Sequence, residues 1–257
     1  ERAKAAGIMF GGQVLGISST TFVAGQLMFV SRLLLMASSL TADLVLHNVW
    51  RLFRQPSPWP RLFLLSISWT SGIATATTGT RIRRNVFYAA NHHSWIDIPV
   101  MSGVTGCTFV ANDGIESWPL IGWLCRINNT IFVSRENRAS VGNQVDDLRA
   151  AITGNQPVTI FPEGTTHDGT GLLPFKPSLF AALVPPPPGM LVQPVFLTYG
   201  RHTPRVAWIG EEKVTENFWR LLSYLKPITA TLHFLGVTAN DSLRGFACVG
   251  DRHDMLR

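Results

Sequence analysis

Charged residues are scarce in this chain. Asp, Glu, Lys and Arg make up 15% of its 257 residues, whereas roughly a quarter of the residues are charged in a typical soluble protein. The mean hydropathy is accordingly positive, +0.18. So little charge leaves much of the surface apolar, and we expect part of it to meet lipid. The length is sufficient for one large core, and we expect a single α/β domain with an N-terminal appendage.

Cysteine and acidic residues are also few. Cys107, Cys125 and Cys248 are odd in number and lack C-x-x-C spacing, which argues against a disulfide framework or zinc site and favours a reducing, cytoplasmic environment. The 22 basic residues outnumber the 16 acidic ones, for a net charge of +6, so an anionic partner such as a phospholipid surface is expected. There is no zinc-finger spacing, RNA-binding aromatic motif or dense Lys/Arg run, and we expect no nucleic-acid partner.

The N-terminal part contains a long stretch without charge, between Lys4 and Arg32. It exceeds the ~20 residues of a membrane-spanning helix, but several polar residues dilute it. We therefore expect an interfacial or re-entrant helix, with a buried core helix as the alternative. The segment 44–65 mixes apolar and basic residues at near-helical spacing, as in a helix of the headgroup layer, until prolines at 56–60 interrupt it. We predict membrane-associating helices in 1–60 and an α/β domain in 61–257.

Beyond residue 60, short apolar runs alternate with segments long enough for helices. Strands are expected at 86–90, 108–111, 131–133, 158–161, 191–197 and 230–235, and the clearest helix at 141–152. This interleaving predicts a mixed, mostly parallel sheet flanked by helices. Open sheets of this kind bind ligands at the carboxyl ends of their strands.

The segment NHHSWID at 91–97 follows directly on the predicted strand 86–90. An unperturbed histidine titrates near ~6.5, and a nearby carboxylate helps it take a proton from an alcohol or water. His92 and Asp97 are five residues apart, so their pairing requires a turn before a helix begins. His93 and Asp97 could pair on a regular helix. On spacing alone both histidines are candidates, and exposed histidines at a capped helix start are the structural alternative.

A second polar segment, FPEGTT at 161–166, follows the predicted strand 158–161. The carboxylate of Glu163 can bind a hydroxyl or an amine, and Gly164 lets the backbone turn and approach a ligand closely. An ordinary acidic residue at a helix start is the alternative interpretation.

Two protein classes other than an enzyme that uses a histidine base are compatible with these residues. The nitrogen and oxygen atoms of His92, His93, Asp97, Glu163 and His167 are sufficient for a metal-dependent lipid hydrolase, although the spacing is not HExxH. A non-catalytic membrane-binding module is the other alternative, and it would tolerate replacement of His92. A serine hydrolase is not expected, because the chain has no G-x-S-x-G motif.

The pattern Asn91-His92-x4-Asp97 resembles the HX4D motif of the glycerolipid acyltransferase family, which includes bacterial lysophosphatidic acid acyltransferases of the PlsC type. Three further blocks follow in the family's order: WPLIGW at 118–123 with IFVSR at 131–135, FPEGTT at 161–166, and VQPV at 192–195. The resemblance covers roughly 86–199.

This resemblance implies direct acyl transfer from acyl-CoA or acyl carrier protein to a lysolipid hydroxyl, without an acyl-enzyme and without a bound cofactor or metal. His92 would be the general base, Asp97 would orient it, and Arg135 would contact the acceptor headgroup or the donor's phosphates. The enzyme would act at a membrane, on the cytoplasmic face of the bacterial inner membrane. Further substrate contacts are expected from Asn91, Ser94, Glu163, Gly164, Thr165, Thr166, Lys176 and Pro194.

Two departures from the family pattern bear on the acceptor. Thr166 stands where lysophosphatidic acid enzymes usually have Arg, and Asn112 where the family often has Lys. The absence of both cations argues against a phosphomonoester. We expect a lyso-aminolipid, such as the lyso-ornithine lipids used by one bacterial branch, with Glu163 or Asp168 against the amine. Formation of phosphatidic acid from 1-acylglycerol-3-phosphate is the alternative.

Overall fold

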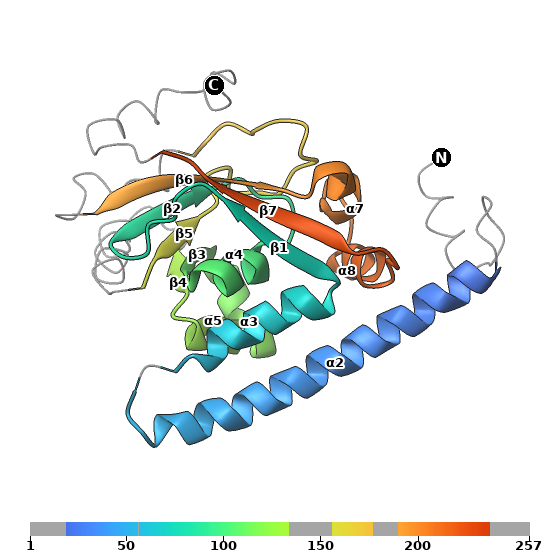
Figure 1. The fold of residues 1–257 in the computed structure, drawn as a ribbon, viewed down its shortest axis with the longest axis horizontal. Coiled ribbons are helices and arrows are strands. Elements are labelled where there is room, and N and C mark those ends of the chain that lie inside the picture. Colours follow the sequence, from blue (N-terminus) through green and yellow to red (C-terminus); the bar gives the residue numbers. More distant parts are fainter. Residues whose placement is uncertain (1–18, 56, 134–155, 177–189, 237–257) are drawn as a thin grey trace.

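A seven-stranded sheet forms the centre of the molecule. The computed structural model describes residues 19–55, 57–133, 156–176 and 190–236, and within them the strand order is β1-β7-β6-β2-β5-β3-β4 (Figure 1). Neighbouring strands are parallel except β6 and β7, which are antiparallel. The strands are β1 (Ile73–Thr78), β2 (Val86–Ala90), β3 (Thr108–Asn112), β4 (Ile131–Val133), β5 (Val158–Ile160), β6 (Leu191–Thr198) and β7 (Ile228–Phe234). The predicted mixed, mostly parallel sheet is confirmed.

Helices α3, α4 and α5 lie on the side of the sheet that faces α2, and α7 and α8 lie at one end of it (Figure 1). The helices are α2 (Ser19–Arg51), α3 (Trp59–Thr70), α4 (Asp97–Thr105), α5 (Pro119–Ile127), α7 (Thr203–Val206) and α8 (Val214–Leu222), with short 3-10 turns η1 (Asp113–Ser117) and η4 (Gly200–His202). The predicted helix at 141–152 lies outside the described residues.

The core is built around β2, whose five residues VFYAA are all buried. On either side β2 pairs with β5 and β6, so neither of its edges is open to water. Tyr88 packs against Phe234 of β7, with ring centroids 5.9 Å apart, and Ile96 at the start of α4 is fully buried. A strand this well enclosed gives a rigid base for the residues that follow it.

Helix α2 has 33 residues, a length of about 50 Å at the usual rise per residue. By length and composition it could cross a membrane, since its best 18-residue window has a mean hydropathy of 1.6 and is 11% buried. One face carries exposed apolar residues at three- and four-residue spacing over 23–34 and again over 45–49, with the exposed polar residues Ser38 and Thr41 between them. The apolar stripe of α2 consists of Val23, Leu27, Val30, Leu34, Val45 and Val49.

The other face of α2 contacts the globular part through Arg32. This side chain is buried, and its Nη1 donates to the carbonyl oxygens of Leu222 at 3.0 Å and Tyr224 at 2.9 Å. These carbonyls lie at the C-terminal end of α8, where backbone oxygens lack helical partners and a cation is favoured. Arg32 therefore links α2 to the end of α8. Pro58 is the N-cap residue of α3 and Pro60 lies in its first turn, while a domain boundary at residue 60 stays a prediction.

Candidate active site

The two polar segments predicted to carry the chemistry meet at one edge of the sheet. NHHSWID follows β2 and FPEGTT follows β5, and these strands are parallel neighbours, so their carboxyl ends adjoin. Backbone and side-chain hydrogen bonds join the segments: His167 N donates to His92 O at 3.2 Å, and His92 N donates to Glu163 Oε1 at 3.3 Å. The prediction that both motifs lie at strand ends is confirmed.

His92 and Asp97 form a hydrogen-bonded pair, with 2.8 Å between Nδ1 and Oδ2. Helix α4 begins only at Asp97, so the preceding turn can bring together two residues that are five apart. The imidazole stacks on Phe161, with ring centroids 4.0 Å apart and an interplanar angle of 13°. With Nδ1 donating to Asp97, Nε2 is the nitrogen left to accept a proton.

Asp97 is completely buried, and four donors satisfy its carboxylate. Oδ2 accepts from His92 Nδ1 and from the backbone amides of His93 at 2.6 Å and Ser94 at 2.9 Å, while Oδ1 accepts from the Tyr199 hydroxyl at 2.5 Å. A buried charge with several well-placed donors is stabilised rather than neutralised. Asp97 is thereby fixed in position and orients the His92 ring.

The electrostatics keep Asp97 ionised. Burial alone would raise the pKa of Asp97, but the hydrogen bond and charge of His92, the charge of His93 and the hydrogen bond from Tyr199 hold it below its ordinary value. Burial and the adjacent Asp97 charge raise the pKa of Tyr199 well above its ordinary value, so Tyr199 stays protonated and acts as a donor. The carboxylate can then stabilise a positive charge on His92.

His93 occupies a different environment. Its side chain is buried, with its ring centroid 5.8 Å from that of Tyr199 and 5.3 Å from that of His167. Burial is the main cause that lowers the pKa of His93, outweighing the opposing charge of Asp97. His93 gives Asp97 only its backbone amide. The geometry thus answers the question that spacing left open, and His92 is the histidine paired with the carboxylate.

The Glu163 carboxylate is buried and bonded to the backbone of neighbouring loops. Its side chain is buried; Oε1 accepts from His92 N, and Oε2 accepts from Leu173 N at 2.9 Å. The Nε2 atom of His167 lies 3.1 Å from Oε2 without hydrogen-bond alignment. Burial raises the pKa of Glu163, although the amides of Leu173 and His92 and the charge of His167 oppose this shift. This geometry favours bracing of the loops around His92 over direct contact with an acceptor.

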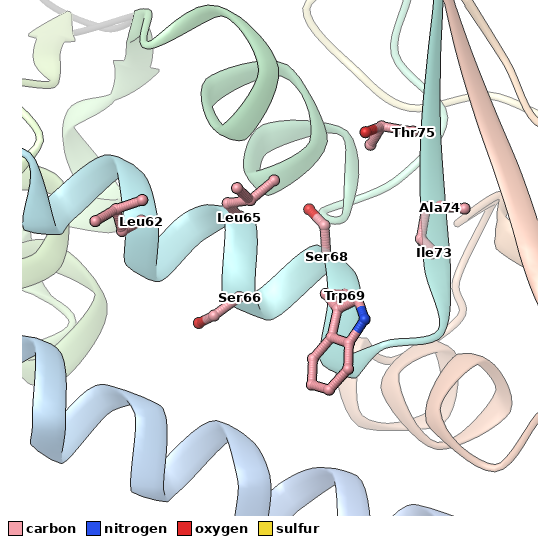
Figure 2. Close-up of a pocket in the computed structure, with 8 residues that line it drawn as sticks. All are labelled: Leu62, Leu65, Ser66, Ser68, Trp69, Ile73, Ala74 and Thr75. Atoms are coloured by element: carbon pink, nitrogen blue, oxygen red, sulfur yellow. The ribbon is translucent and has the colours of Figure 1, made fainter.

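A cavity of about 420 Å³ opens beside His92. Of the predicted substrate-binding residues, Gly164, Thr165 and Thr166 line it together with His92. Its apolar wall is formed by Ile98, Phe109, Val110, Ala111, Ile115, Ile160 and Phe161, and its remaining wall by Trp208, Gly210 and Glu212. A second hollow of about 410 Å³, between α3 and β1 (Figure 2), contains none of the predicted site residues. The first cavity is therefore the candidate substrate pocket.

Several other residues predicted to contact substrate are buried in the fold and do not line the pocket. Asn91 is buried and exchanges two hydrogen bonds with the Leu197 backbone, of 2.7 and 2.9 Å, which ties the end of β2 to β6. The hydroxyl of the buried Ser94 donates to Asn217 Oδ1 at 3.2 Å. Pro194 is buried within β6, where it is the register partner of Ala89.

Of the two remaining predicted contacts, Lys176 and Arg135, only Lys176 lies in the described part of the chain. Lys176 packs over Gly164 closely enough that its Nζ would lie 2.8 Å from a Cβ there, and Gly164 has a φ of +66°. Gly164 thus meets both requirements that favour glycine, a positive φ and a close approach. Arg135 lies outside the described residues, and its contact with a headgroup or phosphate stays a prediction.

The structure adds Asn217, which lies beyond the four sequence blocks. It is fully buried in α8, and its Oδ1 accepts from Ser94 Oγ and from Trp95 Nε1 at 3.0 Å. Its Nδ2 donates to Ala207 O at 3.2 Å and to Glu212 Oε2 at 3.2 Å. Asn217 therefore fixes the turn before Asp97 to the segment 203–212, which supplies one wall of the pocket.

Four of the five side chains suggested for a metal centre lie in two separate pairs. His92 pairs with Asp97 and His167 lies against Glu163, and His93 is buried beside His167 and Tyr199. Among the described residues no three His, Cys, Asp or Glu side chains form a group that could hold a metal ion. The arrangement is that of a base with its orienting carboxylate.

Several known sequences are similar to this chain. A family model described as Acyltransferase matches residues 74–198. The lyso-ornithine lipid O-acyltransferase of Rhizobium meliloti is 42% identical over 143 residues, which are 50% of this chain and 49% of that protein. The chain thus spans about half the length of this relative. A protein of the same description from Rhodobacter capsulatus is 31% identical over 209 residues, covering 77% of this chain and 73% of that protein.

Other relatives are described with a different acceptor. The 1-acyl-sn-glycerol-3-phosphate acyltransferase of Neisseria gonorrhoeae is 34% identical over 156 residues, or 59% of this chain and 60% of that protein. Among solved structures, the 1-acyl-sn-glycerophosphate acyltransferase PlsC from Thermotoga maritima matches with a TM-score of 0.52 and 22% identity, covering 83% of this chain and 88% of that one. At this identity the structural match supports the fold alone.

Proposed function

Because the chain belongs to the acyltransferase family, we propose that it is a lysolipid O-acyltransferase that moves a fatty acyl group from a thioester to a lysolipid hydroxyl. The observation that carries the proposal is the His92–Asp97 pair at the carboxyl end of β2, facing a largely apolar cavity. The pair can activate a hydroxyl, and the apolar wall suits an acyl chain.

The transfer needs two proton movements, both through His92. The acceptor hydroxyl gives its proton to Nε2 while its oxygen bonds to the thioester carbonyl carbon. The carbon–sulfur bond then breaks, and His92 returns the proton to the departing thiolate. Asp97 stabilises the imidazolium between these steps. The donor is an acyl-CoA or acyl carrier protein thioester, consumed as a co-substrate, and no bound cofactor or metal takes part.

A lyso-aminolipid is the proposed acceptor. Thr166 lines the pocket and its Oγ1 donates to Trp208 O at 2.6 Å, so this position supplies neither a cation nor a free hydroxyl for a phosphomonoester. Relatives described as lyso-ornithine lipid O-acyltransferases support the same class. Phosphatidic acid formation is the second candidate, because a relative described as a 1-acyl-sn-glycerol-3-phosphate acyltransferase also matches.

The proposed location is the cytoplasmic face of a bacterial inner membrane. The apolar stripe of α2 is exposed on the side away from Arg32, and a helix of this kind can insert into the acyl boundary or cross it. Both substrates of a lysolipid acyltransferase carry long chains, so a membrane-attached enzyme can take them up laterally.

The test is acyl transfer by the purified protein in detergent, with labelled acyl-CoA and acyl carrier protein offered to lyso-ornithine lipid and lysophosphatidic acid. We expect turnover with the amino-lipid to exceed turnover with the phosphate lipid. His92→Ala should abolish transfer to both, while His202→Ala, a partly exposed histidine outside the pocket lining, should not. Turnover by a folded His92→Ala protein would contradict the general-base role, and no transfer by the wild type would contradict the proposed function itself.

A further inference from the structure

The pocket beside His92 contains one carboxylate and no lysine or arginine among its described lining residues. The carboxylate is that of Glu212, whose side chain is 19% exposed. Glu212 lies outside the four sequence blocks, and neither the motif nor its spacing pointed to it. Glu212 is thus the one residue among Asp, Glu, Lys and Arg in the described pocket lining, and its ion-pair partner Arg220 is not part of that lining.

Thr166 holds the segment that brings Glu212 to the pocket. Its hydroxyl donates to Trp208 O at 2.6 Å, and Trp208 Nε1 donates to Glu212 O at 2.7 Å. Trp208 N also donates to His93 O at 2.8 Å. The residue that replaces the arginine usual in lysophosphatidic acid enzymes therefore removes a cation and also anchors the turn that carries an anion.

The Glu212 carboxylate can accept one further hydrogen bond. Its Oε1 accepts from Arg220 Nε at 3.1 Å, and its Oε2 accepts from Arg220 Nη2 at 2.8 Å and Asn217 Nδ2 at 3.2 Å. A carboxylate offers about four lone-pair sites, so these contacts leave about one on Oε1. Arg220 cannot turn toward a ligand freely, because it also donates to Pro204 O at 2.7 Å and Ala207 O at 2.6 Å.

We propose that Glu212 binds the ammonium group of the acceptor headgroup and so selects amino-lipids over phosphomonoesters. This inference rests on the proposed acyl transfer. It replaces the expectation that Glu163 or Asp168 meets the amine: the oxygens of Glu163 are buried and engaged, while Asp168 is 53% exposed, absent from the pocket lining and bonded to Thr170. A charge-assisted hydrogen bond from an ammonium to a carboxylate is among the stronger polar contacts.

The experiment compares three acceptors with three full-length proteins. The acceptors are lyso-ornithine lipid, the same lipid acetylated on its headgroup amine, and lysophosphatidic acid. The proteins are the wild type, Glu212→Gln, and Glu211→Gln as the matched control, since Glu211 is the exposed neighbour outside the pocket lining. The measured quantity is kcat/KM for each pair, with thermal melting as a check on folding.

We expect Glu212→Gln to lower kcat/KM for lyso-ornithine lipid by about ten- to a hundredfold, as for loss of a charged hydrogen bond, and to leave lysophosphatidic acid unchanged or improved. Acetylation of the amine should lower the wild-type kcat/KM by a similar factor. For Glu212→Gln, kcat/KM should be no lower with the acetylated lipid than with lyso-ornithine lipid. An equal loss for all three acceptors would overturn the proposal in favour of a bracing role. Wild-type indifference to acetylation would overturn it without any variant, even if Glu212→Gln failed to fold.

The outcomes also separate this inference from the proposed function. If the wild type transfers acyl groups to lyso-ornithine lipid and to its acetylated form equally well, acyl transfer stands and the role of Glu212 fails. If the wild type transfers to no lysolipid, the proposed function fails as well.

Discussion

Tyr199 donates a hydrogen bond of 2.5 Å to Asp97 Oδ1, the carboxylate oxygen that His92 does not use. Both side chains are buried. Tyr199 directly follows β6, whereas Asp97 begins α4, so this bond joins two elements that are far apart in the sequence. Both oxygens of the Asp97 carboxylate are thereby fixed, and the hydrogen bond to Asp97 in turn fixes the orientation of the His92 ring.

Removing this donor should impair catalysis more than folding. In Tyr199→Phe the buried Oδ1 loses its only side-chain donor among the described residues, and the pKa of Asp97 should rise toward its ordinary value. We expect kcat to fall by about tenfold, with the acid side of the pH–rate profile shifted to higher pH. A fall in kcat with an unmoved pH profile would indicate a packing defect and contradict the positioning role.

Asp97 should also give the fold a recognisable pH dependence. Its pKa in the folded state is held below the ordinary value, so its charge stabilises the protein above the unfolded value of ~3.9. This contribution is lost as the pH falls through the folded pKa. Asp97→Asn should thus lower the free energy of unfolding by ~1–3 kcal/mol at pH 7, and the difference from the wild type should shrink below about pH 4.

Urea unfolding of wild type and Asp97→Asn at pH 7 and at successively lower pH measures this difference. Burial shifts the pKa of Glu163 in the opposite direction, but Glu163 is present in both proteins and largely cancels in the comparison. Asp113→Asn, at an exposed residue of η1, is the control and should give no such pattern. A difference that stays constant with pH would argue against a stabilised charge at Asp97.

The contact of Arg32 with the end of α8 should be important for stability. Arg32→Met keeps the aliphatic part but leaves the carbonyls of Leu222 and Tyr224 without this donor. We expect the free energy of unfolding to fall by ~2–3 kcal/mol. Arg51→Met, at an exposed residue at the end of the same helix, removes the same charge and should have little effect. Equal losses in the two variants would show that charge, rather than the cap, is responsible.

Membrane attachment should depend on the apolar stripe of α2. The double variant Leu27→Gln/Leu34→Gln changes residues that are 67% and 66% exposed, so the fold should be unaffected. Withdrawing two leucines from lipid should weaken partition into anionic vesicles by at least about tenfold. Thr41→Gln, at an exposed polar position of the same helix, is the control. Unchanged vesicle sedimentation of the double variant would contradict membrane contact through this stripe.

Much of the sheet could be predicted because its central strands are short apolar runs that end in polar motifs. β2 and β4 begin and end where the sequence indicated. The edge strand β1, with the sequence IATATT, was missed because alternating small and hydroxyl residues at an edge give no apolar run. The pairing of His92 rather than His93 with Asp97 depends on where α4 begins, which spacing alone does not decide.

The residues that hold the site in place could not be predicted from sequence patterns, for a different reason. Tyr199 and Asn217 act through hydrogen bonds to residues that are 102 and 123 positions away in the sequence. Glu212 lines the pocket in a turn that Thr166 holds through Trp208, 42 positions away. Each is an ordinary polar residue in its own local sequence. In the sequence Arg32 marked only the end of an uncharged stretch, because its partners are backbone carbonyls at and beyond the end of α8 that no residue pattern reveals. Long-range polar contacts therefore account for most of what the sequence did not predict.

Substitution of Thr166 tests acceptor choice, because it can change both the charge of the pocket and the anchoring of the turn that carries Glu212. Thr166→Arg introduces the cation usual in lysophosphatidic acid enzymes and also removes the hydroxyl that donates to Trp208 O. A guanidinium can bind a phosphomonoester through two hydrogen bonds. We expect the ratio of kcat/KM for lysophosphatidic acid over lyso-ornithine lipid to rise by at least about tenfold.

Two further variants separate the contributions of charge and anchoring. Thr166→Ser keeps the donor to Trp208 and should retain the wild-type ratio, because neither the pocket charge nor the anchor changes. Thr166→Val removes the donor without adding charge; it should lower turnover with the amino-lipid, since Glu212 is then held less firmly, but should not improve turnover with the phosphate lipid. If Thr166→Val shifts the ratio as far as Thr166→Arg does, the position selects acceptors through loop anchoring alone, and the missing cation carries no specificity.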